Sequence, residues 1–467
     1  MFRISTTVLV LVLLTAVLSA QEYRLERVAE IRFPASSAGC GSTDTTGGSD
    51  CWGYTAPDGS EYALMGVRDG IAVVKIPEMD VIDVVAGPGG LDCYWHRDIQ
   101  TYGHYAYAVA EMNGTNEGLM ILDLQHLPDS VRFVGSYAPF SEVTSHNMHI
   151  DTATGFAYIC RQNGRGFRVV DLSDPEQPAD VYLVETGSIH DVYARNDTVI
   201  VSEGSQGGFQ IWDLSVKTSP QLLARFVMPN SGYAHNAWMS DDGDYVMTTE
   251  ETVDKTIKMW DIRQMDQISL VGEWLGASRL AHNTHIMGDL AFISHYTYGV
   301  TVLDIGDPTT PTEVAHYDTH PRNDASGFDG CWGAYPYTAA GYVYASSFNG
   351  ALTLLRLEPV STAIEPDDVP LPRNTVLAAN YPNPFNPSTT IPFRLMETAR
   401  IRLTVHDVLG RSLRVLADGN RSAGEYALVW DGRDNAGRTL PSGTYLVTLA
   451  VDGVRDFQVT RRMTLAR

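Results

Sequence analysis

Residues 167–184 read FRVVDLSDPEQPADVYLV, a short apolar segment that ends in Asp-Leu, followed by an Asp-Pro turn and a second apolar segment. The first of these segments recurs along the chain at intervals of about 42 to 52 residues, which is the spacing of four-stranded propeller blades and not of solenoid repeats. The seven copies are IAVVKI (71–76), LMILDL (119–124), FRVVDL (167–172), FQIWDL (209–214), IKMWDI (257–262), VTVLDI (300–305) and LTLLRL (352–357).

A hairpin signal precedes each copy, as in DGSEYALMG at 58–66, so each repeat is predicted to supply four strands. No fourth strand follows the last copy, whereas EYRLERVAEIRF at 22–33 has the pattern of a fourth strand without a repeat of its own. We expect residues 22–33 to pair with the last copy, because this pairing removes an open sheet edge. The sequence therefore predicts an all-β chain with a seven-bladed β-propeller at residues 21–358.

The repeats resemble the LVIVD repeat, and residues 22–358 resemble the choice-of-anchor B family of exported β-propellers. This resemblance implies a β-propeller fold and export from the cell, but it does not imply a particular reaction. It rests on the Asp-ended segments and on the motifs DCWGY (50–54), WHRDIQTYGHYAYAVAE (95–111), AHNAW (234–238), AHNTH (281–285) and GCWGAYP (330–336).

A second composition begins after a linker at 359–375. Residues 376–467 contain no Lys and many Arg, and their short apolar strands between Gly and Asn/Asp turns predict a small Ig-like β-sandwich. This part resembles the type A sorting domain of type IX secretion cargo, which is similar to the Ig-like module of flagellar hook-capping proteins. The resemblance implies that residues 376–467 engage the type IX secretion machinery. It rests on YPNPFNP (381–387), VLG (408–410), WDGRD (430–434) and SGTY (442–445).

The start of the chain and its charge predict an exported protein. Residues 1–20 carry one charged side chain, Arg3, and the apolar run VLVLVLLTAVL, which is the layout of a cleavable signal peptide. No other stretch approaches spanning length, so the mature chain is expected to have no transmembrane segment. A net charge of −23 argues against nucleic acid as a partner. The expected location is the cell surface of a bacterium or its surroundings.

The five cysteines leave their pairing open. Cys160 lies inside the strand-like segment FAYICR and is expected to be a buried free thiol. The other four cysteines allow three connectivities, between which the sequence does not decide.

Histidine and tryptophan occupy equivalent positions of the repeats. When we count back from the second strand of each repeat, one residue per repeat falls at the start of the innermost strand, beside the axial channel. The following positions are polar in the middle repeats. We expect a ligand-binding channel mouth that contains Trp52, Trp95, His96, Arg97, Asp98, His146, His190, Asp191, His235, His282 and Trp332.

A metal ion is one candidate ligand for this mouth. The second strand of each hairpin returns to the same face, where it brings carboxylates close to the imidazoles. Imidazole with carboxylate suits Zn²⁺ or Mn²⁺, and carboxylate with Asn oxygens suits Ca²⁺. The sequence does not identify a cofactor, but it allows a divalent ion such as Ca²⁺, Zn²⁺ or Mn²⁺. The candidate ligands are His146, His190, His235, His282, Glu203 and Glu250.

Three functions remain open at this stage. The favoured one is a binding module for an unidentified surface ligand. The second is a metal-dependent hydrolase in which His or a metal-bound water acts as base and Glu203 or Glu250 acts as acid or ligand, although no catalytic motif accompanies these residues. The third is a scaffold in which the His and Trp side chains fill the channel and hydrogen-bond to neighbouring backbone.

Overall fold

The structure is a computed structural model, and it contains strands and turns but no helix within the residues that it describes. The prediction of an all-β chain is confirmed there. The chain divides into two compact units, residues 1–362 and 363–467. The described residues are 23–35, 47–89, 96–138, 144–160, 166–322, 325–360, 376–395, 399–422, 424–452 and 457–466.

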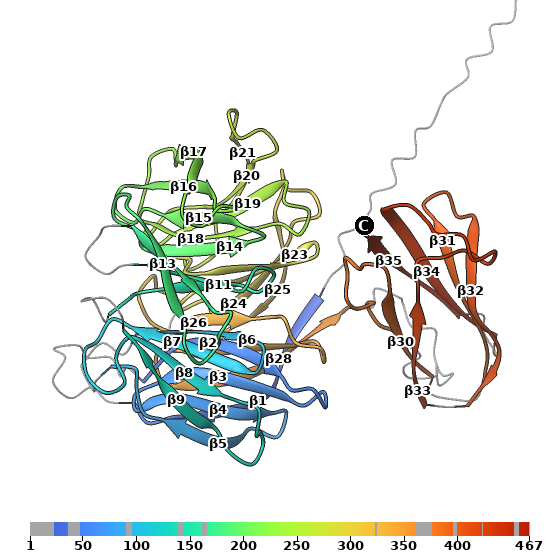
Figure 1. The fold of residues 1–467 in the computed structure, drawn as a ribbon, viewed down its shortest axis with the longest axis horizontal. Coiled ribbons are helices and arrows are strands. Elements are labelled where there is room, and N and C mark those ends of the chain that lie inside the picture. Colours follow the sequence, from blue (N-terminus) through green and yellow to red (C-terminus); the bar gives the residue numbers. More distant parts are fainter. Residues whose placement is uncertain are drawn as a thin grey trace, which may run out of the picture. The chain divides into compact units, whose positions relative to one another are not determined.

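The first unit contains seven antiparallel four-stranded sheets in its described part (Figure 1). In hydrogen-bonded order, the first three are β2 (Gly48–Thr55), β3 (Glu61–Val67), β4 (Gly70–Ile76) and β5 (Asp80–Val85); β6 (Arg97–Tyr102), β7 (Tyr105–Ala110), β8 (Leu119–Asp123) and β9 (Arg132–Tyr137); and β10 (Met148–Asp151), β11 (Phe156–Cys160), β12 (Phe167–Asp171) and β13 (Ala179–Val184).

The next three sheets repeat this order along the chain. They are β14 (Asp191–Arg195), β15 (Thr198–Ser202), β16 (Gly208–Asp213) and β17 (Gln221–Val227); β18 (Ala234–Met239), β19 (Tyr245–Glu250), β20 (Ile257–Asp261) and β21 (Ser269–Trp274); and β22 (Thr284–Met287), β23 (Leu290–Ser294), β24 (Val300–Asp304) and β25 (Thr312–Tyr317).

The seventh sheet joins two distant parts of the chain. Its strands are β26 (Cys331–Tyr335), β27 (Tyr342–Ser347), β28 (Ala351–Pro359) and β1 (Tyr23–Arg32). Strand β1 runs antiparallel to β28, from Tyr23 opposite Pro359 to Arg32 opposite Ala351. The expected pairing of residues 22–33 with the last repeat is thus confirmed over residues 23–32, and β28 has a partner on both sides.

The repeated Asp-ended segments are the third strands of the sheets. Their side chains are almost all buried, because both faces of the strand contact a neighbouring sheet, whereas the fourth strands are largely exposed. In six sheets the pairing of third and fourth strands is interrupted by a bulge at the same place in the repeat, such as Val169/Val170 in β12 and Ile211/Trp212 in β16. A bulge strengthens the local twist, so all six sheets are twisted alike near their outer edge.

The first strands of the sheets bring the middle of the unit together. Contacts join β2 to β6, β6 to β10, β10 to β14, β14 to β18, β18 to β22, β22 to β26 and β26 back to β2. The apolar clusters lie between consecutive sheets, as where Tyr62 and Leu64 pack with Ile99 and Met120. The apolar core is therefore divided into layers between the sheets, and the side chains at the start of the first strands face one another across the middle.

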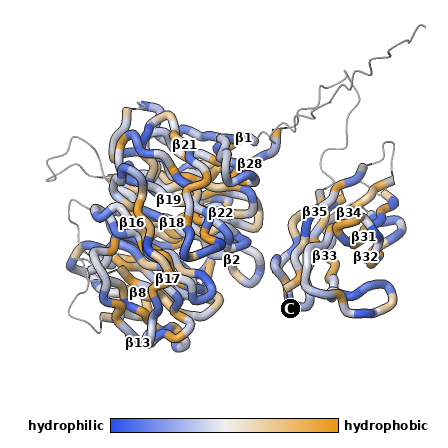
Figure 2. Tube along the Cα trace, turned by 90° about the horizontal axis from the view of Figure 1, so that it is seen from above, coloured by the Kyte–Doolittle hydropathy of each residue, from blue (hydrophilic) through white to orange (hydrophobic). Residues whose placement is uncertain are grey.

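The second unit packs two sheets around Trp430, Phe385 and Tyr445. Phe385 lies inside the YPNPFNP motif and is 1% exposed, which gives this motif a role in the core. Apolar and polar segments alternate along the strands (Figure 2), as expected for sheets with one buried face. The sheets are β29 (Val376–Leu377), β30 (Thr389–Leu395) and β33 (Gly424–Trp430); and β32 (Ser412–Arg421), β31 (Ala399–Asp407), β34 (Gly443–Asp452) and β35 (Phe457–Leu465).

Three cysteines in the described residues are buried and free: Cys51, Cys160 and Cys331. The expectation for Cys160 is confirmed. Cys40 and Cys93, like the predicted signal peptide at 1–20 and most of the linker at 359–375, lie outside the described residues. Within the part of the chain that the structure describes, no helix is long and apolar enough to cross a membrane.

Candidate functional site

Six side chains from six sheets form a closed circle in the middle of the first unit, which we call the histidine ring. Consecutive ring centroids lie 4.1 Å (His96–His146), 4.1 Å (His146–His190), 4.3 Å (His190–His235), 4.4 Å (His235–His282), 4.9 Å (His282–Trp332) and 5.2 Å (Trp332–His96) apart. Each residue lies at the start of the first strand of its sheet or just before it. The repeats therefore bring together histidines that are far apart in sequence.

A second layer of Asp and Asn lies next to the ring, and we call it the Asx belt. Its residues lie one position after a ring histidine in four sheets and two positions after His96, and Asp50 comes from the sheet without a ring residue. Its side chains accept backbone N–H groups from the next sheet. Ile99 donates to Asp50 (3.2 Å), Met148 to Asp98 (2.7 Å), Val192 to Asn147 (3.1 Å) and Thr284 to Asn236 (3.0 Å). These bonds tie consecutive sheets together. The belt consists of Asp50, Asp98, Asn147, Asp191, Asn236 and Asn283.

An inner layer of mostly aromatic side chains lies two residues beyond the belt, because alternate residues of a strand face the same side. It comprises Trp52, Gln100, His149, Tyr193, Trp238, His285 and Tyr335. Trp238 packs on His285 at 4.4 Å and on Tyr193 at 4.6 Å between ring centroids. His149 Nδ1 accepts a hydrogen bond from the side-chain amide of Gln100, at 3.2 Å.

Trp52 does not lie where the comparison of the repeats placed it, and the prediction for Trp95 is not tested. Trp52 was expected beside the histidines, but it lies in the inner layer, 4.9 Å from Tyr335, because Asp50 is the belt residue of its sheet. Trp95 lies outside the described residues, and His96 stacks on His146 in the ring. The pairing of β2 with β3 has a bulge between Gly48 and Cys51, so the positions of the first repeat do not align with those of the other repeats when residues are simply counted.

Three ring histidines hold one nitrogen against an oxygen. His190 Nδ1 lies 3.2 Å from the backbone oxygen of His235, and His282 Nδ1 lies 2.6 Å from that of Trp332. His146 Nδ1 lies 2.7 Å from Glu111 Oε1. A proton on Nδ1 satisfies these contacts and leaves the Nε2 lone pair available. This is how metal-binding histidines are usually oriented.

Burial keeps most of the ring neutral. It lowers the pKa of His96, His190 and His235 well below the ordinary value, and neighbouring histidines lower these pKa values further. Burial lowers the pKa of His282 to about 3. Neutral imidazoles keep a lone pair for a metal ion at neutral pH, whereas protonated ones have none.

His146 is the exception in the ring. Burial acts to lower its pKa, but the hydrogen bond to Glu111 and the charges of Glu111, Asp191 and Asp98 outweigh burial and raise the pKa above the ordinary value. His146 and Glu111 are partly exposed, with 17% and 20% of their side chains accessible. The ring thus has one edge where an imidazole is charged more easily.

The carboxylates beside the ring are Glu111 and Glu251, and not the two named from the sequence. Glu203 is 1% exposed and accepts two hydrogen bonds from Arg225, at 2.7 and 2.6 Å, and one from Gln210. Glu250 is equally buried and pairs with Lys258 at 2.7 Å. Both charges are already compensated, so neither carboxylate is free for a metal ion.

The sequence analysis did not identify Glu251 because it assumed that β18 and β19 pair without a bulge, and it therefore placed Glu250 beside the ring. The pairing of β18 with β19 is bulged between Ala234 and Asn236, and β19 ends at Glu250. Glu251 Oε1 then lies 3.7 Å from His235 Nε2 and accepts a hydrogen bond from the hydroxyl of Tyr296. Burial raises the pKa of Glu251. The two consecutive glutamates in the sequence were the only signal of this alternative.

Arg97, Asp98 and Asp191 belong to the walls of the site. Arg97 is 1% exposed, and its guanidinium donates to the backbone oxygens of Pro88 (3.0 Å) and Val67 (2.9 Å), where burial lowers its pKa to about 10. Burial raises the pKa of Asp191 to about 8, and it also raises the pKa of Asp98. Arg97 therefore points at backbone, and the two carboxyls lie in the Asx belt.

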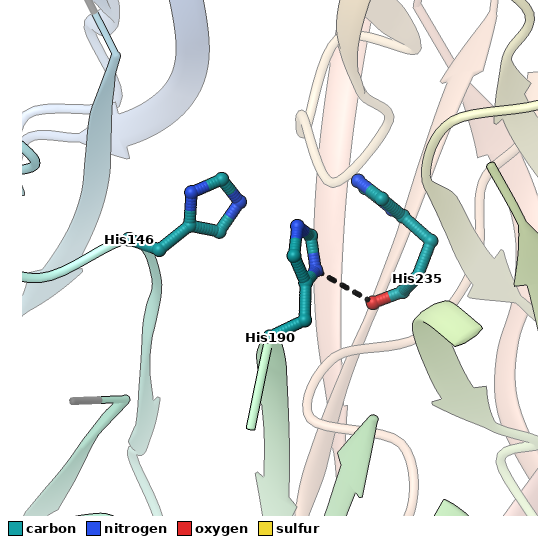
Figure 3. Close-up of side chains that lie close together, drawn as sticks. All are labelled: His146, His190 and His235. Carbon is teal, nitrogen blue, oxygen red and sulfur yellow. Dashed lines mark hydrogen bonds between the residues drawn. The ribbon is translucent and has the colours of Figure 1, made fainter. Parts of the chain in front are cut away.

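Among the residues that the structure describes, three groups of His and Glu have ligand atoms that lie within 4.8 Å of one another, and all three include ring histidines. Figure 3 shows the first group, with the imidazoles of His146, His190 and His235 close together and the His190 contact to the backbone of His235. The groups are His146, His190 and His235; His96, Glu111 and His146; and His235, Glu251 and His282. Such a donor set suits a borderline transition metal such as Zn²⁺.

Comparisons with known proteins match parts of the chain. The LVIVD repeat model matches residues 148–186 and 278–319, and the FlgD Ig-like domain model matches residues 385–453. The basal-body rod modification protein FlgD is 32% identical over 84 residues, both in Salmonella typhimurium and in Salmonella typhi. The aligned part is 17% of this chain and spans 36% of the length of these curated relatives.

A solved structure of U3-55K is similar in fold to a large part of the chain. The similarity covers 68% of this chain and 97% of that chain, with a TM-score of 0.50 and 10% sequence identity. At this identity the likeness concerns the fold alone. By sequence, the chain contains LVIVD repeats and a FlgD-type Ig-like domain.

Proposed function

We propose that the protein is an exported binding protein whose histidine ring holds a divalent transition metal such as Zn²⁺. The observation that carries this proposal is the orientation of the ring: His146, His190 and His282 hold Nδ1 against an oxygen and keep Nε2 for a ligand. His146, His190 and His235 are the first ligand set, with Glu251 and His282 beside them.

The architecture behind this proposal is a seven-bladed β-propeller over residues 21–358. The closed cycle of contacts between first strands and the strand that the start of the chain adds to the last sheet support it. The matches to the LVIVD repeat agree with the choice-of-anchor B resemblance, whose finer assignment is part of the proposal.

The proposed route of export has two signals. The apolar run in residues 1–20 acts as a signal peptide. Residues 376–467 act as a type A sorting domain that engages the type IX secretion machinery, and the Ig-like match at 385–453 supports the fold that this role needs. In a bacterium with this machinery, the full chain is expected outside the outer membrane, and a chain that ends at residue 375 is expected in the periplasm. Equal location of both chains in cell fractions would refute the sorting role.

The metal proposal is tested by elemental analysis of protein purified without an immobilised metal. One transition-metal ion per chain is expected in the wild type and none in His235→Ala, while His104→Ala, at a partly exposed position outside the ring, serves as control. A chelator should lower the melting temperature of the wild type and of the control only, because bound metal stabilises the folded state by about 4 kcal/mol at a thousandfold excess over Kd. A metal-free wild type whose melting is unchanged by chelator would overturn the proposal.

A metal-dependent hydrolase is the second candidate, and Glu251 favours it. Three protein ligands leave a coordination position for water, which the metal activates. A neighbouring carboxyl of raised pKa can transfer the proton, as a general acid or base does. Glu251→Gln should then abolish turnover of ester, phosphoester or peptide substrates without changing the metal content. If the metal-loaded protein hydrolyses none of these substrates, the hydrolase candidate is rejected and the proposal of a binding protein is kept.

A further inference from the structure

A small cavity lies inside the ring of sheets, lined by the Asx belt and the inner layer. Its volume is about 20 Å³. A single water molecule or a single monatomic ion fits such a volume, and an organic ligand does not. The belt side chains that line it are Asp50, Asp98, Asn147, Asp191, Asn236 and Asn283.

The oxygens of the cavity wall are paired with protein groups only in part. Asp50 and Asp98 each use Oδ2 for a backbone N–H, and Asp191 uses Oδ2 for the side-chain amide of Asn236. The carboxyl groups of Asp50 and Asp98 also hydrogen-bond to each other, and the backbone N–H of Val192 contacts the carboxyl group of Asp191. The Oδ1 atom of Asn283 is buried and lacks a hydrogen-bond partner.

His285 provides a second, independent sign of an occupant. Its side chain lines the same cavity and is only 6% exposed. Its Nδ1 atom is buried and has no hydrogen-bond partner. Buried polar atoms are nearly always paired with protein, water or an ion, so two unpaired atoms around one cavity indicate that something fills it.

The charge of the wall favours a cation over water. Three carboxyl groups line the cavity, and the described residues of its lining include no Lys or Arg. The nearest guanidinium, on Arg97, is directed at the backbone oxygens of Pro88 and Val67. Buried carboxylates without a counter-charge are unfavourable, and a bound cation compensates them.

We propose that this cavity binds one Ca²⁺ ion through the carboxyl groups of Asp50, Asp98 and Asp191 and through Oδ1 of Asn283. An all-oxygen set is the choice of a hard cation, whereas the histidine ring offers nitrogen. Mg²⁺ fits less well because it keeps several of its waters, for which the cavity has no room. This site is separate from the metal site proposed for the histidine ring.

Asp→Asn variants test the site without a change of shape. The belt already has Asn at three of its six positions, so Asn at position 50 or 191 is compatible with the same architecture. Asp50 is the better single test, because no histidine of the ring comes from its sheet. Asp191→Asn tests a second proposed ligand, from another sheet.

The full chain is titrated with CaCl₂ by calorimetry after removal of metal by a chelator. One ion per chain is expected for the wild type, with Kd raised at least about tenfold in Asp50→Asn and binding lost in the Asp50→Asn/Asp191→Asn double variant. Tb³⁺ gives a second readout, because Trp52 and Trp238 line the cavity and sensitise its emission. His235→Ala should bind Ca²⁺ and Tb³⁺ like the wild type while it loses the transition metal.

The outcomes separate the two sites. Ca²⁺ binding that persists in His235→Ala and disappears in the double variant supports the belt site, whatever the transition-metal content. Calcium heat or Trp-sensitised Tb³⁺ emission that is the same in the double variant as in the wild type assigns binding to the acidic surface and overturns the proposal. No heat and no change in melting temperature with Ca²⁺ means that a water molecule fills the cavity, which also overturns it.

Discussion

The histidine ring and the Asx belt repeat around the same centre, but their side chains are satisfied in different ways. In the belt, Asp98 and Asn147 each accept a backbone N–H from the next sheet, which gives both side chains a structural role. In the ring, His190 and His282 use one nitrogen for a backbone oxygen and keep the other. A polar residue that recurs in every sheet can therefore have a purely structural role. A candidate site is indicated where a recurring side chain keeps an atom, such as histidine Nε2, that can bind a ligand.

Acidification should have the largest effect, through the histidines of the inner layer. Burial lowers the pKa of His149 to about 4 and that of His285 to about 3, whereas the unfolded chain titrates near 6.5. Below about pH 6.5 the unfolded state binds more protons, so stability is lost as pH falls through this window. At about 1.4 kcal/mol per pKa unit, each histidine costs about 3 kcal/mol or more by pH 3.

Urea unfolding followed by fluorescence at a series of pH values measures this loss. His149→Gln has no titrating group at this position and should unfold at a lower pH than the wild type. An acid midpoint that does not move would mean that carboxylates elsewhere control acid unfolding and that the inner layer has only a packing role.

Removing a belt side chain should come next in size. Asn236→Ala leaves the backbone N–H of Thr284 and a carboxyl oxygen of Asp191 without their present partners. Each buried group left unsatisfied costs about 1–3 kcal/mol, so a loss of about 2–6 kcal/mol is expected for the two groups in denaturant unfolding. Asn236→Asp keeps the acceptor and should lose less. Equal losses in both variants would show that the bond to Thr284 does not hold the sheets together.

Asp191 should give a pH dependence of opposite sign to that of the inner layer. Its pKa is raised to about 8, while an unfolded Asp titrates near 3.9. Between these values the folded state holds the extra proton, so stability falls as pH rises, by about 1.4 kcal/mol per pH unit in metal-free protein. Asp191→Asn should flatten the stability curve by that amount. A slope that matches the wild type would place the proton on another group.

The smallest expected effect concerns one ring position. Glu111→Gln removes the main cause that raises the pKa of His146, so this pKa should fall in an NMR titration while stability changes little, since both side chains are partly exposed. Glu176→Gln, which changes a carboxylate at the outer edge of a sheet, is the matched control and should leave His146 unchanged. A shift in the control as large as that in Glu111→Gln would indicate a general charge effect.

Much of the fold could be predicted because each repeat contains an apolar segment of the same length. The third strands, the closing pair of strands β1 and β28, and the free Cys160 follow from the pattern of the sequence. A strand with two buried faces needs a continuous apolar run, and such runs are easily found.

The site was less predictable, because bulges change the count of residues. One bulge in β2 moves Trp52 from the ring into the inner layer, and another in β18 brings Glu251 to the ring in place of Glu250. The charges of Glu203 and Glu250 are compensated by Arg225 on β17 and Lys258 on β20, and no sequence spacing indicates these contacts. Which carboxylate is free depends on tertiary pairing, and this is absent from a linear pattern.

Pairing between β1 and β28 has a consequence for biosynthesis. Glu30 and Thr353, which contact each other across these strands, are 323 positions apart. A ribosome completes β1 early and β28 only after six other sheets have been made, so the earliest strand has to wait without its partner. A chain shortened to begin after residue 32 should leave β28 as an open edge, and such edges recruit strands from other molecules. The sheet that contains β1 and β28 can therefore be completed only after nearly the whole first unit has been synthesised.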